Sequence, residues 1–506
     1  MIAKREEAKR KREEEELEEA RNAHPLDEAM AEIDMEQKRR AHPSLTWKSS
    51  LSRDADNRNN NNNSHDDDDD NNKNTSLYAK RQKRLEGRVR VPTLFQTCVN
   101  FVVQNFEYVE SLGDVDSSIR RAIAQELVAQ NKLDRAAYTA IVEPGMEALE
   151  LVDCAELTQD HLAESLKSLL PMGLRYLLLH HAGRCFGPRT VKAIRSVDDC
   201  KLFALSIAGA YMLSDQDVAD LIHHLSDCLT SLEFRACPLL GDKFCQSIPA
   251  GYGESGLLVE LSLEDMVLSK EAVKSLGSTA LRNLKSLSLR QVESVDDEVV
   301  LHLLDHVQHL EGIDLSFNHN ITDAALSAIR SCNTNGTLRS LTLSGLKNLT
   351  QVGIETLFTD NLKGLPSPPR LRRLNLSECD FAAVTDNIVD LACKASSMKR
   401  LDGSISDTLS TTGGLVYVAL SGSSCTDYAM ESLAATSARS LQELNVCFCP
   451  KITNKGLGYL VSKTSHQFRL IHIWGNAQIT EEFLDGHDRC DDTSFDVEGA
   501  WMKKTN

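Results

Sequence analysis

Residues 441–457 read LQELNVCFCPKITNKGL, and the order of residue types in this stretch predicts a strand, a turn and a helix. Leu444 and Val446 are separated by one polar residue, which is the period of a strand with one buried face. A cysteine follows, and then I-T-x-x-G-L opens a helical segment. Residues 310–326, LEGIDLSFNHNITDAAL, show the same order. The chain therefore contains more than one copy of a strand–turn–helix unit.

The pattern L-x-x-L-x-L recurs with conservative replacements in twelve units. Their first residues are 146, 174, 202, 229, 258, 284, 310, 338, 371, 415, 441 and 468, so nine of the eleven intervals are 26–29 residues long. This spacing is typical of leucine-rich repeats. The longest interval, 44 residues, holds a predicted inserted loop, KASSMKRLDGSISDTLSTTGG.

Alternation along each strand predicts which side chains are buried. In the unit that starts at residue 284, Leu287 and Leu289 should point inward, whereas Ser288 and Arg290 should point outward. One unit cannot bury its apolar side alone, but stacked units can. We therefore predict an α/β fold, a leucine-rich-repeat solenoid with parallel strands on the concave face and helices outside.

Composition divides the chain into four predicted segments. Residues 1–90 form a disordered tail with many charged residues, an Asn/Asp-rich run (RNNNNNSHDDDDDNNKN) and a basic end (LYAKRQKRLEGRVR). The basic end is a nuclear import signal, a local phosphate contact or a soluble linker. Residues 91–140 form a small helical segment, 141–485 the solenoid and 486–506 a C-terminal tail.

Charge and cysteine usage narrow the possible environments. The net charge of −18 argues against non-specific attraction to nucleic acid or anionic membrane. Fourteen cysteines occur without an apolar leader segment at the N-terminus, which predicts reduced thiols in the nucleus or cytoplasm. No apolar run approaches the roughly 20 residues that span a bilayer, so no membrane association is expected.

Motifs of enzymes are absent from the sequence. It has no Walker A motif, G-x-G-x-x-G, G-x-S-x-G or H-E-x-x-H, so we predict neither catalysis nor a cofactor. Cys237, Cys379 and Cys449 share one turn position, where structural burial is expected. Metal binding by Cys447 and Cys449 is the alternative, although no second Cys/His pair has zinc-finger spacing. No metal site is therefore predicted.

Outward strand residues predict what the concave face can bind. Acidic residues outnumber basic ones there, so we expect a protein partner, with DNA contact only indirect or weak. The candidate contact residues on this face are His180, Arg235, Arg290, His472 and Trp474.

Residues 93–102, TLFQTCVNFV, precede the repeats. Thr93 follows a proline and is a predicted helix N-cap. Leu94, Cys98 and Val102 are four residues apart and form one narrow apolar ridge on a helix. The stretch resembles the elongin C-binding box of SOCS-box and von Hippel–Lindau-type receptors, whose four positions are filled by Thr93, Leu94, Cys98 and Val102. An ordinary buried helix is the alternative.

A wider resemblance covers residues 92–154, through TLFQTCVNFVVQNFEYVESLGDV and LELVDC, and extends over the repeats to about residue 485. This region resembles the leucine-rich-repeat subunit of the fungal global-genome nucleotide-excision-repair complex, the radiation-sensitive-seven family. The repeats with a turn cysteine also resemble those of F-box proteins.

The family resemblance implies a non-catalytic subunit that recognises damage. It implies a nuclear protein that serves as substrate receptor in an elongin C/cullin-type ubiquitin ligase. An additional cytoplasmic location is left open. The implied partners are elongin C, a cullin, a SWI/SNF-type repair ATPase and a protein substrate. A cullin-binding L-P-x-P motif is absent after the box. The alternatives are an F-box-like receptor and a repeat scaffold with no ligase link.

Overall fold

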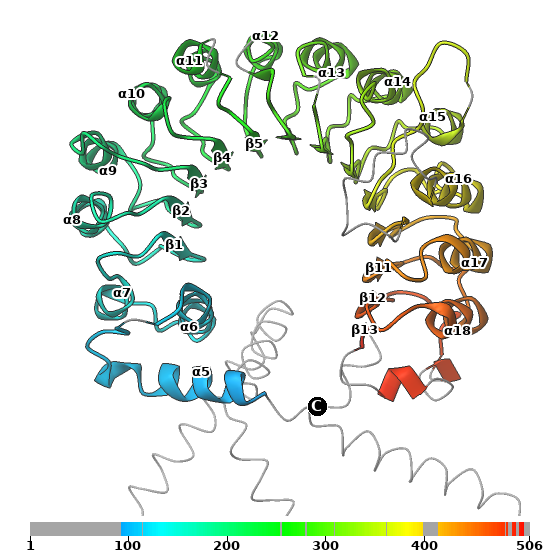
Figure 1. Ribbon diagram of the computed structural model, residues 1–506, viewed down its shortest axis with the longest axis horizontal. Coiled ribbons are helices and arrows are strands. Elements are labelled where there is room, and N and C mark those ends of the chain that lie inside the picture. Colours follow the sequence, from blue (N-terminus) through cyan, green and yellow to red (C-terminus); the bar gives the residue numbers. More distant parts are fainter. Residues whose placement is uncertain are drawn as a thin grey trace, which may run out of the picture. The chain divides into compact units, whose positions relative to one another are not determined.

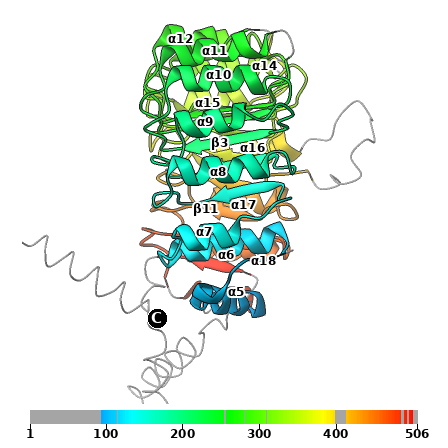
Figure 2. The same ribbon diagram turned by 90° about the vertical axis from the view of Figure 1, so that its left-hand side faces the viewer.

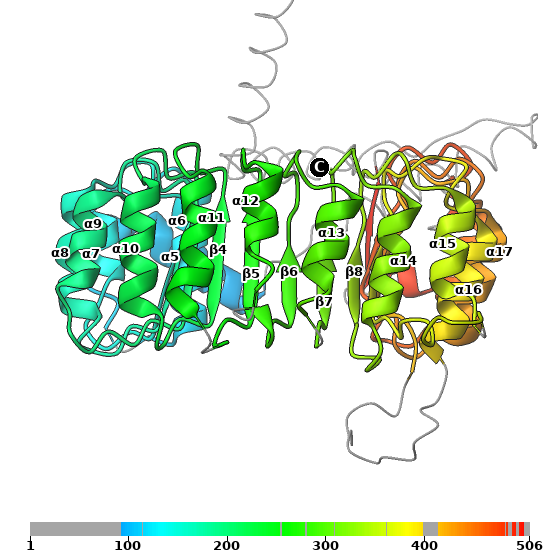
Figure 3. The same cartoon turned by 90° about the horizontal axis from the view of Figure 1, so that it is seen from above.

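The computed structural model describes residues 93–499 apart from 114, 254–255, 279–280, 308, 361, 398–412, 481, 484–487 and 492–494. Within them, thirteen parallel strands form one sheet in which β1 to β13 follow sequence order. The strands line the inner face of an arc and the helices lie outside (Figures 1 and 3). The predicted fold class is therefore confirmed. The N-terminal tail and most of the predicted inserted loop lie outside the described residues.

The strands are short. Their bounds are β1 (Ala148–Leu151), β2 (Tyr176–Leu179), β3 (Ala204–Ala208), β4 (Ser231–Arg235), β5 (Glu260–Glu264), β6 (Ser286–Ser288), β7 (Gly312–Asp314), β8 (Ser340–Thr342), β9 (Arg373–Asn375), β10 (Tyr417–Ala419), β11 (Glu443–Asn445), β12 (Leu470–His472) and β13 (Asp496–Glu498). Each of the twelve predicted repeat units contains one of the strands β1 to β12.

Among the described residues, three helices precede the sheet, and one helix follows each strand from β1 to β11. Their bounds are α5 (Leu94–Gln104), α6 (Ser117–Ala129), α7 (Arg135–Ile141), α8 (Gln159–Leu169), α9 (Pro188–Arg195), α10 (Asp215–Leu225), α11 (Asp242–Tyr252), α12 (Lys270–Ser275), α13 (Asp297–Leu304), α14 (Asp323–Cys332), α15 (Gln351–Phe358), α16 (Asp386–Ser397), α17 (Asp427–Thr436) and α18 (Asn454–Lys463). Short 3-10 helices are η1 (Phe106–Tyr108) and η3 (Asp488–Asp491).

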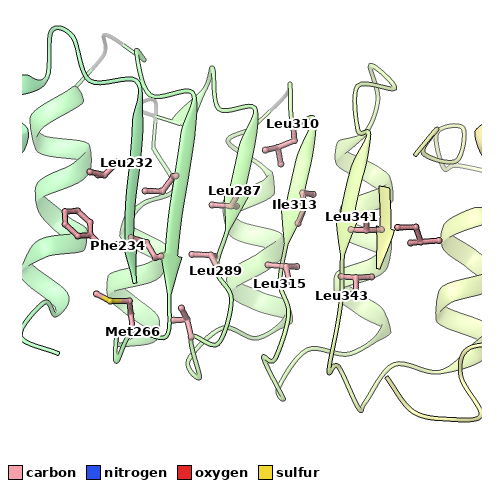
Figure 4. Close-up of a cluster of buried hydrophobic side chains, with 14 of the residues drawn as sticks. Leu232, Phe234, Met266, Leu287, Leu289, Leu310, Ile313, Leu315, Leu341 and Leu343 are labelled. Carbon is pink, nitrogen blue, oxygen red and sulfur yellow. The ribbon is translucent and has the colours of Figure 1, made fainter. Parts of the chain in front are cut away.

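The core consists of columns of side chains from aligned strands. Leu287 pairs in register with Leu261 on one side and Ile313 on the other. Leu287 and Leu289 are both buried, as the alternation predicts. Figure 4 shows these two leucines in rows that continue through Ile313 and Leu315 to Leu341 and Leu343 of the following repeats. Burying one such side chain contributes about 1.5–3 kcal/mol, and the contribution recurs in every repeat.

The turns after several strands, including β7 and β11, carry a buried side chain that donates a hydrogen bond. Asn318 donates through Nδ2 to the carbonyl oxygens of Leu289 (2.7 Å) and Leu315 (2.9 Å). Cys449 occupies the equivalent position and donates through Sγ to the Leu420 carbonyl at 3.1 Å. Both side chains satisfy backbone oxygens that would otherwise be buried without a partner.

The turn cysteines are structural. Cys237, Cys379 and Cys449 are all buried, and each thiol donates to a backbone carbonyl of an adjacent repeat. Burial raises the pKa of all three thiols, that of Cys379 to about 11, which keeps them protonated. Among the described residues, no group of three or more His, Cys, Asp or Glu is placed to hold a metal ion.

The glycine of I-T-x-x-G-L makes room for a link between repeats. The carboxylate of Asp427 accepts hydrogen bonds from the backbone nitrogen (2.8 Å) and hydroxyl (2.7 Å) of Thr453 in the next repeat. A Cβ on Gly456 would collide with this carboxylate. The same arrangement joins Asp323 to the repeat of Gly353. The motif therefore fixes the spacing of neighbouring helices.

The sheet continues beyond the predicted end of the solenoid. β13 pairs in parallel with β12, and Val497 lies opposite Ile471. The segment predicted as a C-terminal tail from residue 486 thus contributes a strand to the sheet. The L-x-x-L-x-L pattern misses this strand because Ser494 and Gly499 stand where its first and last leucines would be.

Candidate functional site

Helix α5 begins at a well-formed cap. Thr93 Oγ1 accepts a hydrogen bond from the Gln96 backbone nitrogen at 3.2 Å, and Gln96 Oε1 accepts one from the Thr93 nitrogen at 3.1 Å. This reciprocal pair is a capping box, which satisfies backbone donors that the first turn leaves free. The predicted N-cap is confirmed.

One face of α5 belongs to the fold. Val99 and Val103 are buried and join a core that includes Phe106 and, from α6, Ile123 and Leu127. α5 packs against α6, and Figures 1 and 2 show α5 beside α6 and α7 at the N-terminal end of the repeats. The helix therefore has a fixed orientation.

The other face of α5 is apolar and open to solvent. Leu94 is 80% exposed and Phe101 68%, and Cys98 is also exposed. Large apolar side chains exposed together on one helix face are typical of an interaction site. The alternative of an ordinary buried helix does not hold for Leu94 and Cys98.

The four positions of the predicted box have different surroundings. Leu94 and Cys98, one helical turn apart, lie together on the exposed face. Val102 is half-buried and packs against the core. Thr93 contributes the cap. The structure therefore brings two of the three apolar box residues together on the open surface, and places the third at its edge.

A buried arginine that the sequence analysis missed anchors the helical segment. Arg120 donates through Nη2 to the Gly113 carbonyl (2.8 Å) and lies 3.4 Å from Glu143 Oε2. Its Nη1 also donates to the Ile141 carbonyl. These bonds tie α6 to the loop after α5 and to the end of α7. An arginine in the charged stretch SSIRRAIAQEL has no sequence feature that distinguishes it from a solvated one.

The same helix engages the first strand of the sheet. Arg121 Nε lies 2.7 Å from Glu150 Oε2. Glu150 is therefore not a free acid of the concave face. The helical segment and the repeats are joined by this ion pair and by contacts between α6 and β1.

The five candidate contact residues of the concave face do not form one site. The Arg290 guanidinium lies 4.9 Å from the ring centre of Phe317. His472 lies between two carboxylates, 3.4 Å from Glu443 and 3.0 Å from Glu498. His180 and Trp474 are half-buried and Arg235 is exposed. His472 and Trp474 share the repeat of β12, whereas the other three residues belong to the separate repeats of β2, β4 and β6.

An open hollow of about 380 Å³ lies on the concave face between β4 and β8. Its polar lining consists of small and acidic residues: Ser231, Glu233, Glu260, Ser262, Glu264, Ser286, Ser288, Gly312, Asp314, Ser340 and Thr342. Burial raises the pKa of the Asp314 carboxyl. The glutamates Glu233, Glu260 and Glu264 give this part of the concave face its acidic character.

These features define the class: a leucine-rich-repeat protein with an N-terminal helical segment that exposes one apolar helix face. The family model described as "Leucine Rich repeat" matches residues 306–329. No helix among the described residues is long and apolar enough to cross a membrane.

The chain is similar to "DNA repair protein rhp7" of Schizosaccharomyces pombe (strain 972 / ATCC 24843). The two are 24% identical over 314 residues, which cover 60% of this chain and 53% of the relative. The chain thus spans about half the length of the curated relative that it matches.

A solved structure has the same fold. The chain aligns with one from the "Crystal structure of Rad7 and Elc1 complex in yeast" with a TM-score of 0.59 and 17% identity, covering 86% of this chain and 97% of that one. The resemblance to the radiation-sensitive-seven family of repair proteins, predicted from the sequence, is confirmed.

Proposed function

We propose that this chain is a non-catalytic DNA-repair subunit that binds an elongin C-type adaptor through the exposed face of α5. The observation that carries the proposal is the pair Leu94 and Cys98, which lie one turn apart and exposed on a capped helix whose opposite face is buried. A leucine in this position can enter a pocket of the partner without any rearrangement of the fold.

Two comparisons support this role. The similar solved structure is a complex of Rad7 with Elc1, and the curated relative is a DNA repair protein. Two exposed residues of α5, Leu94 and Cys98, also match positions of the elongin C-binding box. The chain thus combines a repeat array, a box helix and the likeness to repair proteins.

The repeat array would hold the protein substrate. In this role the chain is the substrate receptor of an elongin C/cullin-type ubiquitin ligase in nucleotide excision repair, and it acts in the nucleus beside a SWI/SNF-type ATPase. The acidic concave face, with Arg235, Arg290 and His472 in separate repeats, suits a protein surface better than DNA. Contact with DNA would then be indirect or weak.

The test is the affinity of the full chain for a recombinant elongin C-type adaptor, measured by calorimetry. Leu94→Ala should weaken binding roughly tenfold to a hundredfold, because burying a leucine contributes about 1.5–3 kcal/mol. Leu301→Ala is the matched control, since Leu301 is 53% exposed on α13. Both variants should keep the melting temperature of the wild type.

The outcome separates the alternatives. Wild-type protein that fails to bind at micromolar concentration contradicts the proposal and leaves a repeat scaffold. Binding to a Skp-type adaptor instead would favour the F-box-like receptor. Binding that Leu94→Ala and Leu301→Ala leave equally unchanged would place the adaptor elsewhere on the molecule.

A further inference from the structure

The last position of the box does not face the solvent. Val102 is half-buried and packs against the core that contains Val99 and Val103. Its neighbour Phe101, which is not a box position, is 68% exposed. The box pattern therefore selects Val102, whereas the residue exposed on the surface is its neighbour Phe101.

Helix geometry explains this separation. At about 100° per residue, Cys98 lies about 40° from Leu94 on one side and Phe101 about 20° from it on the other. Val102 lies about 80° from Leu94, toward the buried face. Leu94, Cys98 and Phe101 thus form the centre of the exposed face, and Val102 its border.

The ring of Phe101 makes no stacking contact within the described part of the fold. No other described ring or cation stacks on it. Its carbonyl oxygen accepts hydrogen bonds from the backbone nitrogen (3.2 Å) and side chain (2.8 Å) of Asn105, which hold the end of α5 in place. The backbone is fixed while the ring remains in water, an arrangement typical of a preorganised contact residue.

We propose that Phe101 supplies an apolar contact to the adaptor alongside Leu94 and Cys98, and that Val102 instead holds α5 to the fold. The proposal rests on the proposed function, because its occupant is the same elongin C-type adaptor. It is supported by continuity: Phe101 and Leu94 lie on one uninterrupted exposed face, and aromatic side chains dominate the binding energy of many interfaces.

The experiment compares Phe101→Ala and Val102→Ala in the full chain, with the adaptor affinity and the melting temperature measured for each. Phe101→Ala should weaken binding about tenfold and leave the melting temperature unchanged, because the ring is already in water. Val102→Ala should lower the melting temperature and change affinity less. Tyr428→Ala is the matched control, since Tyr428 is an aromatic residue 71% exposed on α17.

The possible failures are distinguishable. If Leu94→Ala weakens binding while Phe101→Ala binds like the wild type, the proposed function stands and the role of Phe101 is refuted. If Val102→Ala loses affinity but keeps its stability, the assignment of the two residues is reversed. If the wild type does not bind the adaptor, both proposals fall.

Discussion

The repeats and helix α5 use the same residue type in opposite ways. Leu287 in β6 is 2% exposed, whereas Leu94 in α5 is 80% exposed. In the repeats each leucine is buried against the next repeat, so the stack leaves this apolar surface inaccessible to a partner. The exposed face of α5 has no neighbour of this kind among the described residues. The contrast shows that apolar pattern alone does not distinguish a stabilising residue from one available to a partner.

The largest expected effect tests the burial of leucines in the repeats. Leu287→Lys would put a charge into the leucine columns at a cost on the order of several kcal/mol. Ser288→Lys places the same charge one residue away on the concave face, beside Glu264, whose carboxylate accepts from the Ser288 hydroxyl at 3.1 Å. Denaturant melts followed by circular dichroism should show a large loss of stability for the first variant only. Equal stability of the two variants would refute the register of β6.

A smaller effect on stability is expected from the same comparison made with a buried and an exposed cysteine. Cys449→Ala leaves a small cavity and removes the donor to the Leu420 carbonyl, which should cost roughly 1–2 kcal/mol. Cys98→Ala removes a thiol that is already in water and should leave the free energy of unfolding unchanged. Denaturant melts of the two variants provide the check. A destabilised Cys98→Ala variant would mean that this face of α5 is packed in the free chain.

Much of the fold could be predicted because the L-x-x-L-x-L pattern recurs in every predicted unit. The strands β1 to β12 fall within the predicted units, and Leu287 and Leu289 point inward as their spacing requires. β13 could not be predicted because it lacks the flanking leucines, and its pairing with β12 becomes visible only in three dimensions.

The site was less predictable, for a geometric reason. A spacing of four residues groups Leu94, Cys98 and Val102, but each step turns about 40° around the helix, so the ridge drifts toward the buried face. Which end of the drift meets the core depends on where α6 packs, and the sequence does not state that. For the same reason the ion pair between Arg121 of α6 and Glu150 of β1 could not be predicted from the sequence.

The most direct test of the central claim is the rate at which Cys98 reacts with a thiol reagent. All fourteen cysteines lie within the described residues, and Cys98 alone is exposed. The half-buried Cys200, Cys228 and Cys332 should react slowly, because burial raises the pKa of each thiol, to about 11 for Cys200 and Cys332, and leaves little thiolate at neutral pH.

Mass spectrometry after brief treatment with iodoacetamide would report the modification of each cysteine, with and without the elongin C-type adaptor. The account predicts that Cys98 is modified first in the free chain and is protected in the complex, while the pattern of the other cysteines does not change. A complex in which Cys98 reacts as fast as in the free chain would contradict the assignment of α5 as the binding helix.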